Sequence, residues 1–252
     1  MDNKKSALFL YCSLLALSLQ NWKSNERREI MSDTFQRTKA GLISISVIYV
    51  SLAILYFSPA QLQCKLALPV GFLFLASLWL LPWQMSLAML FSCIGDYCGA
   101  THNFPGQMGA FALAHIAIIC YFLSRYRVGI ERKKYSRLSK LYIIVATVVT
   151  IPIVVFAFAK IVPHVPEGFL TYGVSVYIML IAMMLWCAMQ QRSLLFASGA
   201  MLFLVSDTVL AWNRFVEHIP NSGYIIMITY YLAQLLLFMR STKWWGRQMK
   251  KE

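Results

Sequence analysis

Charged residues, and acidic residues in particular, are scarce in this sequence. Only 13% of its 252 residues are charged, whereas soluble domains carry about 25%. Asp and Glu together number 10, against 23 Lys and Arg, which gives a formal net charge of +13. Because 59% of the residues are hydrophobic, the composition excludes an ordinary soluble domain and indicates a chain that folds mostly in lipid.

The motifs of several common enzyme classes are also absent. The sequence contains no P-loop, no G-x-S-x-G nucleophile elbow, no H-E-x-x-H pair and no G-x-G-x-x-G turn. Its six cysteines form no C-x-x-C pair and lie mostly in apolar stretches, where a free thiol behaves as a small hydrophobic group. The sequence therefore predicts neither a metal site nor a cofactor.

Long stretches without Lys, Arg, Asp or Glu take the place of such motifs. A helix that crosses a bilayer needs about 20 mostly apolar residues. The longest stretch divides at Pro82, because proline cannot donate a helix hydrogen bond. With single charges allowed inside some spans, eight membrane helices are predicted, at 41–58, 61–81, 83–98, 106–124, 140–160, 168–190, 193–213 and 222–240. The predicted fold class is all-α, a polytopic transmembrane bundle of eight helices.

The basic residues gather between alternate predicted helices. Most lie in segments 21–40 and 125–140, at Arg192 and in the C-terminal tail. Loops rich in Lys and Arg stay on the cytoplasmic side of a membrane, so both termini are predicted to be cytoplasmic, and the membrane to be the inner one if the source is bacterial. The charge then reports orientation, and nucleic acid is not needed as a partner to explain it.

The N-terminal 40 residues are predicted to be an extension of the membrane domain. Lys4 and Lys5 precede the apolar run Ser6–Gln20, which resembles the start of a signal peptide without a clear cleavage site. Translation starting at Met31 and a ninth, short or interfacial helix are the two alternatives. Residues 41–240 form the predicted eight-helix domain, and residues 241–252 a basic cytoplasmic tail.

Four ionisable side chains stand out within the predicted helices, away from their ends or among apolar residues, namely Lys65, Asp96, His115 and Asp207. Such groups are costly in lipid unless they face a cavity or a partner, so each is a functional candidate. Counted at about 1.5 Å per residue from the helix ends, all four lie in the outer half of the bilayer on the predicted topology. We therefore expect one polar cavity that opens outward.

The two acids also stand in similar local sequences. Met-Leu-Phe-Ser-Cys-Ile-Gly-Asp ends at Asp96 and Met-Leu-Phe-Leu-Val-Ser-Asp ends at Asp207, on the third and seventh predicted helices. A parallel internal repeat of four plus four helices would produce this placement and bring the two carboxylates face to face. The structural alternative is an ion pair of either acid with Lys65 or Arg214.

The other candidates have structural alternatives too. His115 is either a hydrogen-bonded core residue or a catalytic one. Tyr230 and Gln234, four residues apart on the last predicted helix, are either interhelical hydrogen-bond partners or part of a site. Lys65 either meets a substrate or extends to the outer interface of the membrane.

Several of these residues lie in segments that resemble the YhhN/TMEM86 family of multi-pass membrane proteins. The most specific segment is Gly199–Phe215, which contains Ser-Asp and ends in Asn-Arg-Phe. The matching residues before and after it are Phe91–Asp96, Gly109–His115, Tyr177, Met184 and Thr229–Gln234. The resemblance covers about residues 41–240 and not the first 30. The chain departs from the family at Cys64–Pro69, where the family often has Lys followed closely by Pro.

Characterised members of this family are lysoplasmalogenases, which hydrolyse the vinyl-ether bond of a lysoplasmalogen to a fatty aldehyde and a glycerophospho-base. The resemblance implies that Asp96, Asp207 and His115 are catalytic. The predicted substrate-binding residues are Lys65, Asn213, Arg214, Tyr230 and Gln234. The predicted partners are a lysophospholipid substrate and the bilayer itself.

Vinyl-ether hydrolysis suits a pair of carboxyl groups. An acid protonates the β-carbon, and water captures the resulting oxocarbenium ion as a hemiacetal, which collapses to aldehyde and alcohol. Burial and a like-charged neighbour favour the protonated form of one carboxyl, while the other stabilises the cation, as in glycosidases. The alternatives are a proton-coupled transporter or lipid-binding membrane protein that uses the Asp pair, and a hydrolase of another lipid ether or ester.

Overall fold

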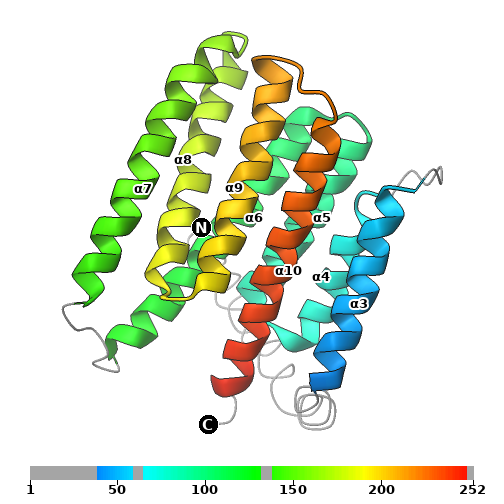
Figure 1. Cartoon of the computed structure of the whole chain (residues 1–252), viewed down its shortest axis with the longest axis vertical. Coiled ribbons are helices and arrows are strands. Elements are labelled where there is room, and N and C mark those ends of the chain that lie inside the picture. Colours follow the sequence, from blue (N-terminus) through cyan, green and yellow to red (C-terminus); the bar gives the residue numbers. More distant parts are fainter. Residues whose placement is uncertain (1–38, 59–64, 132–137, 249–252) are drawn as a thin grey trace, which may run out of the picture. The chain divides into compact units, whose positions relative to one another are not determined.

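A computed structural model describes residues 39–58, 65–131 and 138–248 of the chain (Figure 1). The chain divides into two units, residues 1–45 and 46–252. Of the first unit, only the start of one helix, residues 39–45, is described. The predictions for Ser6–Gln20 and for a start at Met31 lie outside the described residues.

The regular structure of the described residues is entirely helical. The α-helices are α3 (Lys39–Tyr56), α4 (Leu68–Leu80), α5 (Trp83–Ala100), α6 (Phe104–Glu131), α7 (Leu138–Lys160), α8 (Phe169–Gln190), α9 (Leu194–Phe215) and α10 (Ser222–Gln248). A short 3-10 helix, η1 (Val162–His164), follows α7. The predicted all-α fold and its eight helices are confirmed over this part of the chain.

Five of these helices are long and apolar enough to cross a membrane. Their spans are Phe104–Tyr126, Leu141–His164, Phe169–Gln190, Leu194–Phe215 and Ser222–Thr242. The apolar helices Gly41–Tyr56 and Leu68–Leu80 are shorter. Along α7, Ile144, Val148, Ile151 and Val155 are each more than half exposed, and so large an apolar surface requires lipid around it. The chain is an integral membrane protein.

The predicted second helix, 61–81, is wrong at its start, since α4 begins only at Leu68. Pro69 stands in the first turn of α4, where its missing N–H costs nothing because the first N–H groups of a helix have no partner within the helix. Lys65 therefore lies in the turn before α4 and not inside a helix.

Two helices run well past their predicted ends. α6 continues to Glu131 and α10 to Gln248, beyond the predicted ends at 124 and 240. The predictions stopped where charge begins, but Arg, Lys and Gln are good helix formers, so a helix need not end where its apolar stretch does. The predicted tail, 241–252, is therefore helical as far as residue 248.

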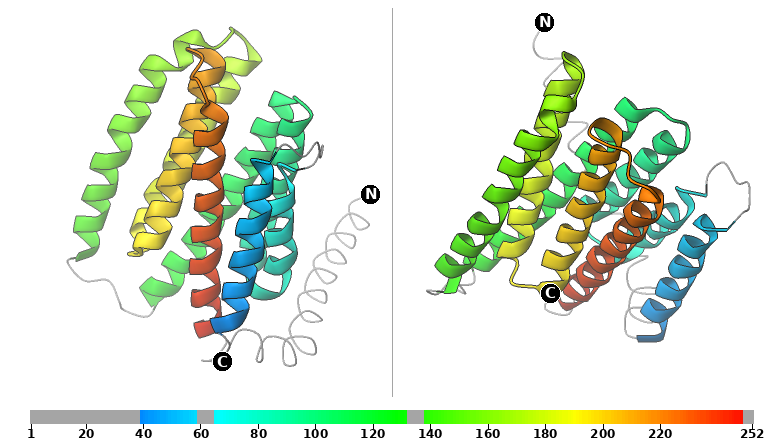
Figure 2. Two further views of the ribbon diagram at one scale, coloured as in Figure 1. Left: turned by 45° about the vertical axis from the view of Figure 1, so that its right-hand side comes forward. Right: turned by 45° about the horizontal axis from the view of Figure 1, so that its top comes forward.

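The helices of the second unit pack chiefly in two neighbouring pairs. α5 packs along α6, and α9 packs along α10, while α8 contacts α6, α7 and α9. Figure 2 shows α7 beside α8 at one edge of this group. α9 and α10 approach closely at Gly199, where an added Cβ atom would lie 3.2 Å from the Leu237 side chain. These pairs bring the sequence-predicted acids and their partners together in the interior.

Candidate functional site

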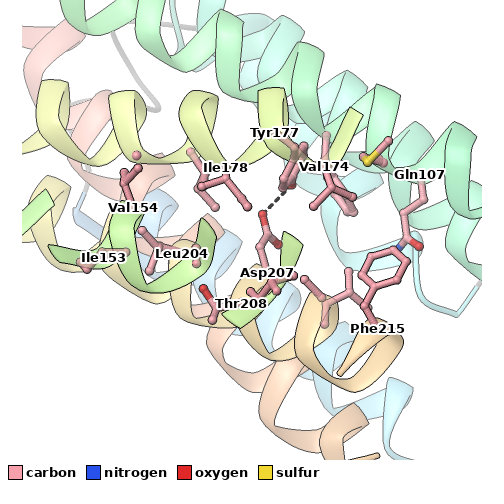
Figure 3. A pocket seen from close by; sticks show the side chains of 18 of the residues that line it. Gln107, Ile153, Val154, Val174, Tyr177, Ile178, Leu204, Asp207, Thr208 and Phe215 are labelled. Carbon is pink, nitrogen blue, oxygen red and sulfur yellow. Dashed lines mark hydrogen bonds between the residues drawn. The ribbon is translucent and has the colours of Figure 1, made fainter. Parts of the chain in front are cut away.

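Asp207 on α9 lies in a cluster with one residue from α6 and one from α8. The Tyr177 hydroxyl donates a hydrogen bond to Asp207 Oδ2 at 2.6 Å (Figure 3). His115 Nε2 lies 3.2 Å from the same oxygen and 3.1 Å from the Tyr177 hydroxyl. We call Asp207, His115 and Tyr177 the Asp207 cluster. Its three polar groups meet at one carboxylate oxygen, an arrangement that can hold a proton and pass it between neighbours.

His115 is held rigidly at this position. It is completely buried, and its ring packs edge-on against Phe203, with the ring centroids 4.8 Å apart. Its Nδ1 atom has no hydrogen-bond partner among the described residues. Within the described ranges, the basic side chain that lies within salt-bridge distance of Asp207 is His115. Neither Lys65 nor Arg214 pairs with Asp96 or Asp207 there, so that structural alternative is wrong.

Asp96 on α5 has a separate partner on α10. The Tyr230 hydroxyl donates a hydrogen bond to Asp96 Oδ2 at 2.9 Å, and both residues are buried. Gln234, one turn further along α10, is fully buried close to the Tyr230 hydroxyl.

The partners of the two acids are crossed between the two helix pairs. α5 and α6 carry Asp96 and His115, whereas α9 and α10 carry Asp207 and Tyr230. Asp207 contacts His115 on the fourth of the eight helices, and Asp96 contacts Tyr230 on the last. The third helix of each group of four thus carries an acid whose partner lies on the fourth helix of the other group.

One pocket among the described residues reaches the Asp207 cluster. It lies between α6, α7, α8 and α9 and has a cavity volume of about 60 Å³. Tyr177, Asp207, Thr208 and Gln107 are its polar lining residues, and nearly all others are aliphatic or aromatic. Figure 3 shows Asp207 and Tyr177 midway along it, with Val154 and Leu204 toward one end and Gln107 and Phe215 toward the other.

Asp96 does not line this pocket, and Phe111 lies between the two. Phe111 lines the pocket. Its ring also lies 3.0 Å from where a Cβ atom on Gly95 would stand, and its centroid is 5.7 Å from that of Tyr230. Of the four residues expected to share one cavity, Lys65, Asp96, His115 and Asp207, the last lines this pocket.

The predicted substrate-binding residues at the helix ends have protein partners. The Lys65 ammonium donates to the Ser58 carbonyl at 3.4 Å and lies 5.7 Å from the Tyr56 ring centroid. Asn213 Oδ1 accepts a hydrogen bond from the Ile219 N–H at 2.9 Å and so fixes the loop after α9. The Arg214 guanidinium is exposed and lies 5.2 Å from the ring centroid of Phe104, a residue that lines the pocket.

Tyr177, Gln107 and Phe111 are site residues that the sequence prediction missed. The sequence marks Tyr177 only as a matching residue of the family, because tyrosine is common in membrane helices. Its role depends on the Asp207 carboxylate on another helix. A polar residue facing an acid on another helix is visible only in three dimensions. No group of three or more His, Cys, Asp or Glu side chains able to hold a metal ion occurs in the part of the chain that the structure describes.

Fold and site together define a polytopic helical membrane protein with an acid, an imidazole and a phenol at one point of an apolar pocket. The family model for YhhN matches residues 59–241. This chain belongs to the YhhN family.

Curated relatives carry names that state an activity. The chain is 30% identical over 152 residues to lysoplasmalogenase TMEM86B of Sus scrofa, covering 60% of this chain and 59% of the relative. It is 37% identical over 87 residues to lysoplasmalogenase TMEM86A of Homo sapiens, covering 31% and 36%. The human TMEM86B matches at 28% over 158 residues, 62% of each protein. The chain thus covers less than two thirds of the length of these relatives. No solved structure gives a significant match.

Proposed function

We propose that this protein is a membrane hydrolase that cleaves the vinyl-ether bond of lysoplasmalogens. The observation that carries the proposal is the position of Asp207, which lies beside Tyr177 and His115 on the wall of an otherwise apolar pocket. A lysoplasmalogen has one reactive ether group on a long hydrocarbon chain. The pocket matches it, because it has one site for proton transfer, at Asp207, and walls that are otherwise mostly apolar. The names of the relatives support the same activity.

Asp207 is the carboxyl group placed to meet the substrate, because it lines the pocket and Asp96 does not. In its protonated form it gives its proton to the β-carbon of the vinyl ether, and the carboxylate left behind stabilises the oxocarbenium ion. Water adds to the cationic carbon and loses a proton to Asp207 or to the adjacent His115. Collapse of the hemiacetal returns a proton to the departing glycerol oxygen and releases the aldehyde.

The remaining groups position Asp207. Tyr177 donates to Asp207 Oδ2 and fixes the orientation of the carboxyl group. Asp96, held by Tyr230, lies outside the pocket and acts through the packing of α5 and α10 against α6 and α9. Asp96 is therefore a positioning residue in this proposal.

Arg214 is the strongest candidate for the lipid phosphate, because it is exposed and stacks on Phe104 at the edge of the pocket. Lys65 and Asn213 have protein partners that account for their positions. With both termini cytoplasmic, as the basic residues favour, this end of the pocket belongs to the outer half of the membrane, and the lipid enters sideways from the bilayer.

The test is aldehyde release by the purified full-length chain in detergent. Substrates are a lysoplasmalogen, its saturated ether analogue and an acyl lysolipid, with aldehyde and fatty acid measured separately. We expect aldehyde from the lysoplasmalogen alone, and its loss in Asp207→Asn. Glu217→Gln, which alters an exposed acid, is the matched control. Full activity in Asp207→Asn would refute the mechanism.

A second candidate function is a proton-coupled transporter or lipid-binding protein. The crossed pairing of the two acids favours it, because internal repeats and acids within the membrane are common in transporters. The same assay separates the two, since a transporter binds the lysoplasmalogen and its saturated analogue alike and releases aldehyde from neither.

A further inference from the structure

The pocket has two chemically different ends on either side of Asp207. Toward one end the lining residues are Ile153 and Val154 on α7, Ile181 and Ala182 on α8, and Leu204 on α9. We call these five residues the aliphatic end, and Figure 3 shows Ile153, Val154 and Leu204 together there. Toward the other end are Gln107 and Phe215, with Phe104 and the exposed Arg214 beside them.

This polarity matches the two parts of a lysolipid that meet at its ether bond. From that bond a hydrocarbon chain runs one way and a glycerophosphate group the other. The amide of Gln107 and the guanidinium of Arg214 can hydrogen-bond a phosphate or a glycerol hydroxyl. The aliphatic end carries no polar side chain, so a phosphate placed there would lose its hydrogen bonds to water without replacement.

The surroundings of the aliphatic end suit a chain longer than the pocket. Val154 lines the pocket, whereas the next residue, Val155, is 61% exposed on the lipid-facing side of α7. Near the outer end, Phe156 of α7 stacks on Trp212 of α9, with ring centroids 6.0 Å apart. α7 packs chiefly on α8. On the α7 side, therefore, α7 alone separates the aliphatic end from the bilayer.

We infer that the aliphatic end is the binding subsite for the hydrocarbon chain of the lipid and that it determines chain-length preference. The inference rests on the proposed function for the identity of the lipid. The head group lies on the Gln107 side and the ether bond lies at Asp207. Each methylene group buried there strengthens binding of the lipid roughly fourfold. The affinity therefore depends on how much of the hydrocarbon chain the aliphatic end buries.

The experiment narrows the aliphatic end and compares two chain lengths. Val154→Trp fills the subsite, and Val155→Trp makes the same change on the neighbouring lipid-facing residue. The substrates are octenyl and hexadecenyl lysoplasmalogens of the same head group, scored by kcat/KM for aldehyde release. We expect the displacement of three methylenes to lower the hexadecenyl-to-octenyl ratio of kcat/KM by roughly sixtyfold in Val154→Trp. Val155→Trp should leave this ratio unchanged.

A binding measurement keeps this subsite separable from the activity. Native mass spectrometry of the detergent-purified chain counts bound hexadecyl and octyl saturated ether lysolipids. If the wild-type chain releases no aldehyde but Val154→Trp selectively weakens hexadecyl binding, the proposed function fails and the subsite stands. If Val154→Trp lowers activity and binding equally for both chain lengths, or not at all, the subsite is refuted.

A second matched pair guards against misfolding of the first variant. Ile153→Trp also fills the aliphatic end, and Ile151→Trp changes a residue on the same helix that is 56% exposed. The same selective loss for the longer chain is expected in Ile153→Trp alone. An equal response of this pair would overturn the assignment.

Discussion

Removing the Tyr177 hydroxyl tests how much Asp207 depends on being held in place. Tyr177→Phe deletes one oxygen, which donates to Asp207 Oδ2 at 2.6 Å. The ring remains to pack against His115, with centroids 5.4 Å apart, so the cluster keeps its packing. The variant therefore isolates the hydrogen bond from the shape of the site.

The size of the effect follows from the strength of that bond. Hydrogen bonds to charged groups contribute about 1.5–3 kcal/mol, which corresponds to roughly tenfold to one-hundred-and-fiftyfold in rate if the bond is needed in the transition state. We expect kcat to fall within this range while KM changes little, because the hydroxyl orients the acid and does not hold the lipid. His115 Nε2, 3.2 Å from Asp207, remains as a second contact and accounts for residual activity.

The assay is aldehyde release at several lysoplasmalogen concentrations, with thermal unfolding in detergent measured alongside. Tyr172→Phe is the matched control, since Tyr172 lies on the same helix but is 75% exposed. A Tyr177→Phe variant that retains wild-type kcat and stability would refute the view that this hydrogen bond positions the acid.

Two further predictions concern the second acid and the helix packing. Tyr230→Phe leaves the buried Asp96 without its 2.9 Å donor, so we expect a loss of about 1–3 kcal/mol in stability, seen as earlier thermal unfolding in detergent, together with slower aldehyde release. Unchanged unfolding would mean that the Asp96–Tyr230 bond adds nothing. Gly199→Ala places a methyl group 3.2 Å from Leu237 and should destabilise by about 1–3 kcal/mol, whereas Gly109→Ala enters open space and should be neutral or stabilising. The reverse order of melting temperatures would contradict the packing described for α9 and α10.

The sequence predicts the helices well because uninterrupted apolar stretches dominate it. Seven of the predicted helices begin within a few residues of the observed ones. The exception is α4, because the predicted span runs through Pro69, whereas the helix begins at Leu68 with this proline in its first turn. Apolarity shows where lipid surrounds a chain, but local backbone chemistry decides where each helix starts.

The acids of the site could be found because an ionisable residue inside an apolar helix stands out. Tyr177 and Phe111 could not, since they belong to residue types that are ordinary in membrane helices. Asn213, which the sequence predicts to bind the substrate, accepts a hydrogen bond from the Ile219 N–H in the loop after α9. The side chain that contacts each residue from another part of the fold shows its role, and the sequence does not give that contact.

The crossed pairing of the acids has a consequence for how the protein is made. Helices enter the membrane in chain order, so α5 and α6 insert before α8, α9 and α10 have been synthesised. During that interval Asp96 lacks the Tyr230 hydroxyl, and His115 lacks the Asp207 carboxylate and the Tyr177 hydroxyl. Unsatisfied polar groups at membrane depth are costly. The early helices therefore gain their full stability only when the last three arrive, and biogenesis of the two halves is a single coupled event.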